Sequence, residues 1–133
     1  SWKEILMMFN KNKIKYFKTK NTFHRPWGKY TNLYHGHNFL IKELYIKPCG
    51  ILSLQKHFHR SEHWVIIKGK PIITLNKKLF KKSENETMFI PKGAIHRIHN
   101  PTKEPVKIIE AQLGSVLKET DIVRYEDVYG RAN

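Results

Sequence analysis

Two stretches decide the fold: LSLQKHFHRSEHW at residues 52–64 and PKGAIHRIHN at residues 91–100. Each places polar side chains on a strand-length segment bounded by turn residues. Side chains two positions apart on a strand face the same side, so Gln55 and His57 point together. A carboxylate from the next strand of the hairpin and a histidine from the second stretch would join them inside an antiparallel barrel.

Turn residues and strand-length segments alternate on both sides of these stretches. Glycine, proline and asparagine form turns at RPWG (25–28), YHGHN (34–38), KPCG (47–50), PKGA (91–94) and NPTKEP (100–105). The segments of strand length are 39–47, 51–57, 63–68, 71–76, 87–91, 95–99 and 106–113. Short strands at regular spacing predict an all-β barrel or sandwich of antiparallel strands.

The two ends of the chain have a different character. Trp2, Ile5, Leu6 and Phe9 recur at the spacing of one helix face, which predicts a short amphipathic helix over 2–9. A lysine-rich arm follows it. We therefore divide the chain into an N-terminal helix and arm at residues 1–23 and a barrel domain at residues 24–133. Residues 118–133 are predicted to form a docked tail or a short helix.

Composition limits the class of protein. A chain of 133 residues with 40% hydrophobic residues fits one domain with a buried core. It has no apolar run near the roughly 20 residues of a membrane-spanning helix. Its N-terminus has no secretory-signal pattern. The single cysteine, Cys49, excludes an internal disulfide framework. We expect a cytoplasmic protein with no membrane partner.

The net charge of +14 raises the question of nucleic-acid binding. The lysines are scattered through every segment and accompany no nucleic-acid-binding motif, so we expect a solvated basic surface and no nucleic-acid partner. The arginines lie in short, unusual local sequences, and the planar fork of an arginine suits phosphate and carboxylate groups. A small anionic ligand is the better prediction.

The two stretches resemble the two sequence motifs of the cupin family. Residues 91–100 match P-x-G-x-x-H-x-x-x-N at every fixed position. For the first motif, G-x5-H-x-H-x4-E-x6-G, aligning His57 and His59 with its histidines leaves too few residues before Glu62. Aligning Gln55 and His57 fits all spacings, with Gln in place of the first His and Cys49 in place of the first Gly. The resemblance implies an antiparallel double-stranded β-helix, the cupin barrel.

This alignment predicts a divalent metal site made of Gln55, His57, Glu62 and His96. Two imidazoles, a carboxylate and an amide oxygen suit a borderline or hard divalent ion. Zn²⁺ is our first choice, with Co²⁺, Mn²⁺, Mg²⁺ and Ni²⁺ as alternatives. The competing interpretations are a barrel without metal, whose histidines cluster by chance, and His59 as a ligand instead of Gln55.

Four stretches carry a more specific resemblance: RPWGKY (25–30), LSLQKHFHRSEHW (52–64), ENETMFIPKGAIHRIHNP (84–101) and IIEAQLGSVLKETDIVRYEDVYGR (108–131). Taken in order, they are similar to the C-terminal cupin domain of type II mannose-6-phosphate isomerases. In that family the domain usually follows a mannose-1-phosphate guanylyltransferase domain, whose glycine-rich nucleotide loop does not precede these stretches. The resemblance implies a stand-alone isomerase domain or a fragment. Cys49 and Phe58 depart from the family pattern, and neither is a predicted ligand.

The resemblance implies a metal-dependent aldose–ketose isomerase that interconverts mannose 6-phosphate and fructose 6-phosphate, in the synthesis of GDP-mannose and polysaccharides. The candidates for binding substrate or phosphate are Arg25, Lys42, Arg60, Arg124 and Arg131. Arginine binds phosphate with a bidentate fork, and a lysine that faces inward among apolar neighbours needs an anion. For the two tail arginines, pairing with tail carboxylates is the alternative.

The general base stays open among His59, Lys42 and Glu110. A rival hypothesis is a non-catalytic cupin that binds a sugar or sugar nucleotide, and a cupin oxygenase is a third. We expect a homodimer in which residues 1–20 form an exchanged arm.

Overall fold

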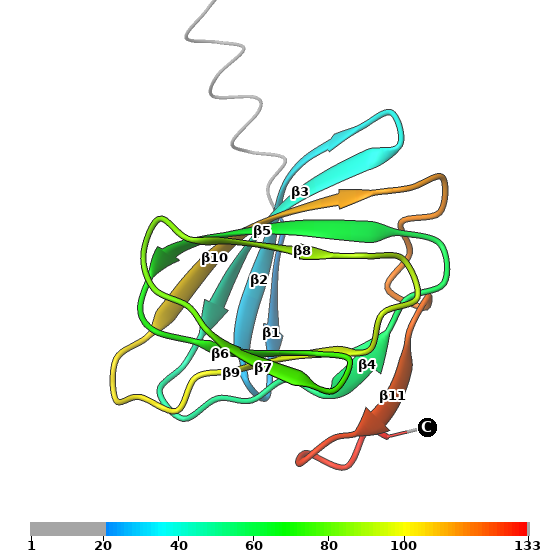
Figure 1. Cartoon of the computed structure of the whole chain (residues 1–133). Coiled ribbons are helices and arrows are strands. Elements are labelled where there is room, and N and C mark those ends of the chain that lie inside the picture. The colour runs from blue at the N-terminus through cyan, green and yellow to red at the C-terminus, as the bar shows by residue number, and fades with distance from the viewer. Residues whose placement is uncertain (1–20, 133) are drawn as a thin grey trace, which may run out of the picture.

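The computed structural model describes residues 21–132, and within that range it contains eleven strands and no helix (Figure 1). The all-β prediction is therefore confirmed for this part of the chain, and the helix predicted over 2–9 lies outside it. The strands are β1 (Asn21–Arg25), β2 (Gly28–Gly36), β3 (Phe39–Ile46), β4 (Leu54–Lys56), β5 (Ser61–Lys68), β6 (Ile72–Leu75), β7 (Lys78–Lys81), β8 (Thr87–Ile90), β9 (His96–His99), β10 (Val106–Leu113) and β11 (Val123–Glu126).

The strands form two antiparallel sheets that lie one above the other in Figure 1. One sheet has the order β1-β2-β3-β10-β5-β8, and the other has the order β11-β4-β9-β6-β7. Strands distant in the sequence therefore lie side by side, with β10 between β3 and β5. This topology brings the two sequence stretches that hold the predicted ligands together between the sheets.

Alternation of side chains gives the barrel its interior. On β3 the residues from Leu40 to Ile46 alternate between buried and half-buried, and on β10 the burial alternates in the same way. The register pairs Ile46 with Val106, which are both fully buried. Further along the same two strands the paired inward residues are Lys42 and Glu110. The interior is thus apolar at one end and polar at the other, and the polar end is where the pocket lies.

Four strands were not predicted individually, namely β1, β2, β7 and β11. β1 and β2 pair with each other along residues 21–36, and β1 begins at Asn21. β6 and β7 form a hairpin whose turn has Asn76 in a left-handed conformation, with φ 54°. The tail contributes β11, which pairs with β4, so it docks on the barrel as a strand.

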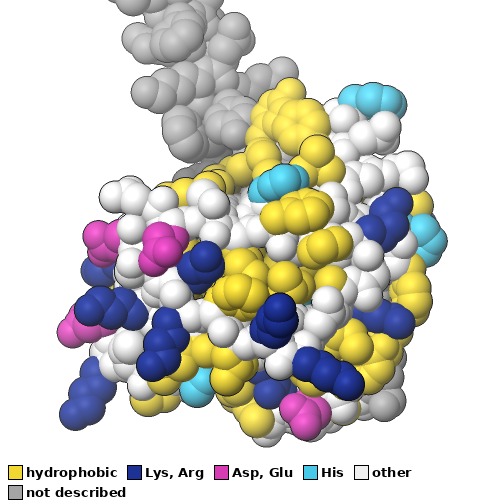
Figure 2. Space-filling view, in the orientation of Figure 1, with side chains coloured by type: hydrophobic (Ala, Val, Ile, Leu, Met, Phe, Trp, Pro, Cys, Tyr) yellow, Lys and Arg dark blue, Asp and Glu magenta, His cyan; other side chains and the backbone are white. Residues whose placement is uncertain are grey.

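The described surface carries basic side chains on many elements. Figure 2 shows lysines and arginines spread over the visible face, with acidic side chains and hydrophobic patches between them. Residues 21–132 contain no helix long and apolar enough to cross a membrane.

Candidate metal centre

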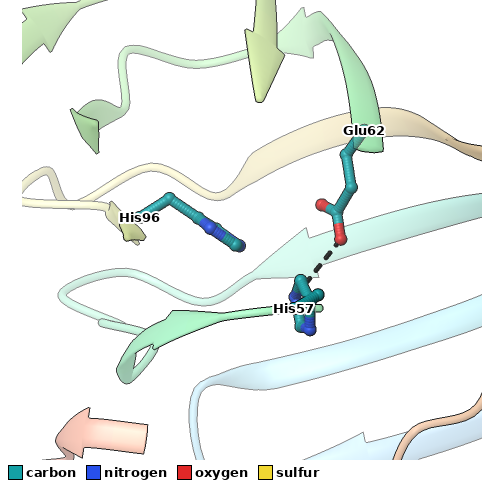
Figure 3. A group of neighbouring side chains, drawn as sticks. All are labelled: His57, Glu62 and His96. Carbon is teal, nitrogen blue, oxygen red and sulfur yellow. Dashed lines mark ion pairs between the residues drawn. The ribbon is translucent and has the colours of Figure 1, made fainter. Parts of the chain in front are cut away.

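Three buried side chains meet at the polar end of the barrel. His57 follows β4, Glu62 lies near the start of β5, and His96 begins β9. One ligand atom from each lies within 4.8 Å of the others. Figure 3 shows the two imidazoles and the carboxylate gathered in one place from three separate segments of the chain. Gln55 is paired with His96 across β4 and β9, and all four predicted ligands line the same pocket.

The two imidazoles are oriented by backbone carbonyls. The Nδ1 atom of His57 lies 2.6 Å from the carbonyl oxygen of Asp121, and that of His96 lies 3.0 Å from the carbonyl oxygen of Ala94. A carbonyl oxygen only accepts hydrogen bonds, so each Nδ1 carries the proton and each Nε2 keeps its lone pair. Burial lowers the pKa of His57 to about 4, which keeps this imidazole neutral.

Glu62 is held as a carboxylate by its neighbours. Its Oε2 accepts a hydrogen bond from the indole of Trp64 at 2.9 Å, and its Oε1 accepts one from Nε of Arg60 at 3.0 Å. Burial by itself raises the pKa of this carboxyl. Interactions with the imidazole of His96 and with the guanidinium of Arg60 outweigh burial and lower the pKa. Oε1 lies 3.3 Å from Nε2 of His57.

The donor set fits a divalent ion. Two imidazole Nε2 lone pairs, one carboxylate and the side chain of Gln55 line one pocket, and the second nitrogen of each imidazole is already bonded. Backbone carbonyls that fix the tautomer are the usual partners of metal-binding histidines.

Strands β10 and β3, in the same sheet as Glu62, carry further polar side chains of the pocket. Glu110 accepts a hydrogen bond from the amide nitrogen of Gln112, and both side chains are buried. Burial raises the pKa of Glu110, and the negative charge of Glu62 raises it further. Lys42 is also buried, forms an ion pair with Glu119, and lies 4.3 Å from the ring centre of Tyr30.

All five residues predicted to bind substrate or phosphate line this pocket: Arg25, Lys42, Arg60, Arg124 and Arg131. Arg25 also donates a hydrogen bond to the hydroxyl of Tyr30 at 3.3 Å. Arg131 pairs with Asp127 at 2.7 Å while still lining the pocket. The alternative considered for this arginine, a tail ion pair, is therefore present in the structure.

His59 lies elsewhere. Its side chain is 57% exposed, it is absent from the residues that line the pocket, and its Nδ1 lies 3.3 Å from the carboxylate of Asp121. The same carboxylate accepts hydrogen bonds from the backbone N–H groups of Phe58 and His59, at 2.9 and 3.0 Å. Asp121 is the residue that sequence reasoning missed, because it lies 64 positions from His57. Gln112 was also missed. It lies two positions after Glu110 on β10, so the alternation of side chains along the strand indicates that both point inward.

Solved structures place this architecture in the cupin class. The Schizosaccharomyces pombe Cnp3 cupin domain matches with a TM-score of 0.66 at 18% identity, covering 74% of this chain and 71% of that chain. The oxalate decarboxylase of Lactobacillus farciminis matches with a TM-score of 0.71 at 16% identity, covering 82% of this chain and 34% of that chain. At such identities the likeness shows the fold alone, and it confirms the predicted cupin barrel.

The sequence comparisons go further, and the chain belongs to the family described as "Mannose-6-phosphate isomerase C-terminal", whose profile matches residues 11–127. Alginate biosynthesis protein AlgA of Pseudomonas syringae pv. tomato is 46% identical over 110 residues, which are 83% of this chain and 23% of AlgA. Mannose-1-phosphate guanylyltransferase ManC of Salmonella typhimurium is 45% identical over 108 residues, or 81% and 22%. The chain thus spans less than a quarter of these relatives. The resemblance stated from the sequence is confirmed.

Proposed function

We propose that this domain interconverts mannose 6-phosphate and fructose 6-phosphate as a metal-dependent aldose–ketose isomerase. The observation that carries the proposal is that the His57–Glu62–His96 cluster shares one pocket with five cationic side chains. A sugar phosphate offers neighbouring oxygens to a metal ion and a phosphate to the cations. Membership of an isomerase family supports the same conclusion.

The reaction moves a proton between two neighbouring carbons. Loss of the C2 proton from open-chain mannose 6-phosphate, with a proton gained at O1, gives a cis-enediol. Return of a proton to C1, with loss of the O2 proton, gives fructose 6-phosphate. A divalent ion held by Gln55, His57, Glu62 and His96, with Zn²⁺ as first candidate and Co²⁺, Mn²⁺, Mg²⁺ or Ni²⁺ as alternatives, would polarise the O1 and O2 oxygens.

We assign proton transfer to Glu110. Its carboxyl lines the pocket, and burial raises its pKa above that of an ordinary glutamate. A carboxyl with a raised pKa suits a group that must accept a proton and return it near neutral pH. Of the other two candidates, Lys42 is engaged by Glu119, and His59 lies outside the pocket lining.

We assign the phosphate to the cationic side of the pocket, with Arg124 and Arg131 as its main ligands. Both arginines line the pocket from the C-terminal tail. The guanidinium of Arg131 is paired with the carboxylate of Asp127. A phosphate can displace this carboxylate, or bind the guanidinium together with it, because both anions fit the same fork of N–H donors. Arg25 and Lys42 would contribute further positive charge.

The test is conversion of mannose 6-phosphate by the metal-stripped protein before and after addition of each candidate ion. We expect activity only with an ion present, and its loss in His96→Ala. A protein that binds mannose 6-phosphate or a sugar nucleotide, yet converts no substrate with any ion, would favour the non-catalytic alternative.

We also propose that the domain acts in the cytoplasm, in GDP-mannose and polysaccharide synthesis, and forms a homodimer. The biosynthetic role rests on relatives named for alginate and xanthan biosynthesis. The exchanged arm expected at residues 1–20 lies outside the described residues. Among the described residues, the outer face of β5 and β8 supports a dimer, because its Val65, Ile67 and Phe89 are 39%, 49% and 50% exposed. The outward positions His63 and Thr87 add no lysine, arginine or carboxylate to this face of a strongly basic chain. A second copy can approach this surface without placing lysines against lysines.

A further inference from the structure

Arg60 is a buried cation within the candidate metal centre. Its side chain is 5% exposed. Its Nε donates a hydrogen bond to Oε1 of Glu62 at 3.0 Å, and its Nη2 lies 3.1 Å from Nε2 of His57. Its Nη1 donates to the carbonyl oxygen of Lys118 at 3.4 Å, on the segment that leads to Asp121. The guanidinium therefore touches two of the predicted ligands and one backbone carbonyl.

These contacts use atoms that a metal ion would need. The Nδ1 proton of His57 is donated to the Asp121 carbonyl, so Nε2 has a single lone pair. That lone pair can accept a hydrogen bond from Arg60 or bind a metal ion, and it cannot do both. Oε1 of Glu62, 3.3 Å from the same nitrogen, is the other atom that Arg60 engages.

We propose that Arg60 is a positioning residue that competes with a divalent ion for the ligand atoms of His57 and Glu62, so that its guanidinium must leave His57 when the ion binds. This inference rests on the metal site proposed above. Arg60 balances the buried charge of Glu62, which would be costly alone. A bound ion would take over that role and repel the guanidinium, which would then turn toward the Lys118 carbonyl.

The shift has a consequence for anion binding. Off His57, the guanidinium would present its Nη2 donors to a pocket that Lys42 and Arg25 also line. A bound metal ion would therefore increase the affinity of the pocket for phosphate, and phosphate would increase the affinity for the ion by the same factor.

Arg60→Met is the direct test, with Co²⁺ alone as the probe and calorimetry as the measurement. We expect Co²⁺ to bind about ten- to a hundredfold more tightly to Arg60→Met than to the parent, the range typical of one hydrogen bond to a charged group. The metal-free variant should melt at a lower temperature, and Co²⁺ should raise that temperature more than in the parent. The matched control is Arg97→Met, which removes the same charge from an arginine paired with Glu126, and it should leave Co²⁺ affinity unchanged.

The outcomes separate the two proposals. If the parent binds no Co²⁺, Zn²⁺ or other candidate ion, the metal site itself is wrong. If the parent binds Co²⁺ and Arg60→Met binds it equally or more weakly, Arg60 supports the ligands and the displacement is wrong. If Co²⁺ binds Arg97→Met as tightly as it binds Arg60→Met, the effect comes from the loss of net charge, and the proposal is wrong.

Arg60→Lys covers the case in which the methionine variant does not fold. Lysine keeps the charge that balances Glu62 but lacks the fork that reaches His57 as well. We expect Co²⁺ binding between that of the parent and that of Arg60→Met, and phosphate affinity that no longer rises with Co²⁺. A lysine variant that binds both exactly as the parent does would contradict the proposal.

Discussion

At the scale of single residues, the tautomers of His57 and His96 make the metal assignment testable. Both rings have Nδ1 on a backbone carbonyl, so only Nε2 can bind an ion. We expect His57→Ala and His96→Ala each to weaken the binding of Co²⁺ or Zn²⁺. The loss of affinity should exceed the about ten- to hundredfold loss that is typical when a residue that only orients a ligand is removed. Gln55→Ala should weaken it less, because an amide oxygen is a poorer ligand than imidazole.

His59→Ala is the matched control for these variants. It removes an imidazole that is 57% exposed and outside the pocket lining, so ion affinity should stay at the parental value. Loss of binding in His59→Ala alone would select the other alignment of the first motif. Parental affinity in both His57→Ala and His96→Ala would remove the metal site.

The raised pKa of Glu110 predicts that the stability of the protein, freed of metal ions by a chelator, depends on pH. In the unfolded chain a glutamate titrates near 4.3, whereas burial and the charge of Glu62 raise the pKa of Glu110 in the folded chain. Between these two values the folded chain retains a proton that the unfolded chain has released. The contribution of this group to the free energy of unfolding is therefore present at low pH and is lost as pH rises toward the raised pKa.

Glu110→Gln removes this proton while keeping the size of the side chain. We expect its melting temperature to approach that of the parent near pH 4 and to exceed it at pH 8, and its isomerase activity to be lost. Glu43→Gln, on the outward side of β3, is the control and should show no such trend. A difference between Glu110→Gln and the parent that is constant with pH would contradict the raised pKa.

The residues of the centre differ in how far sequence could identify them. Gln55, His57, Glu62 and His96 could be found because strand parity and motif spacing are local properties of the chain. Asp121 could not, because its contact with His57 depends on how the tail folds back over 64 positions. The choice among the candidate bases also needed the structure, since burial separates Glu110 from His59.

At the scale of elements, Cys49 lies in the turn between β3 and β4 with φ 61°. A residue with a Cβ is strained in this left-handed region by roughly 1–2 kcal/mol, and glycine is not. Cys49→Gly should therefore raise the free energy of unfolding by about 0.5–1 kcal/mol, after the extra backbone entropy of glycine is counted. Urea unfolding measures this change, and Cys49→Ala, which keeps the Cβ, should not show it.

The elements themselves follow sequence pattern where a strand is buried on one face. β3 and β10 alternate clearly and were predicted within a residue of their bounds. β1 and β2 carry mostly exposed or half-buried side chains and show no such alternation. β11 is short and is stabilised by pairing with β4, a partner that the local sequence does not reveal. β1 and β11 each lie at the edge of a sheet. The pairing partner of such a strand is set by the topology of the whole fold and cannot be read from the local sequence.

At the scale of the whole molecule, the outer face of β5 and β8 predicts the oligomeric state. We expect light scattering to give the mass of a dimer at micromolar concentration. Phe89→Lys should give the mass of a monomer, because it places a charge in the centre of the paired faces. Leu79→Lys is the control: Leu79 is 71% exposed on β7, in the other sheet, and should leave the dimer intact. A monomeric parent, or equal effects of both variants, would reject this interface.

The docking of the tail across the pocket also sets an order of events during synthesis. A chain emerging from the ribosome completes β10 at Leu113, and with it the central strands of both sheets, before Asp121 and the tail arginines exist. His57 has no carbonyl partner at that stage, and the pocket has no tail wall. The strands up to β10 can therefore pair before the tail docks. Docking of the tail then turns a scaffold of paired strands into a complete pocket.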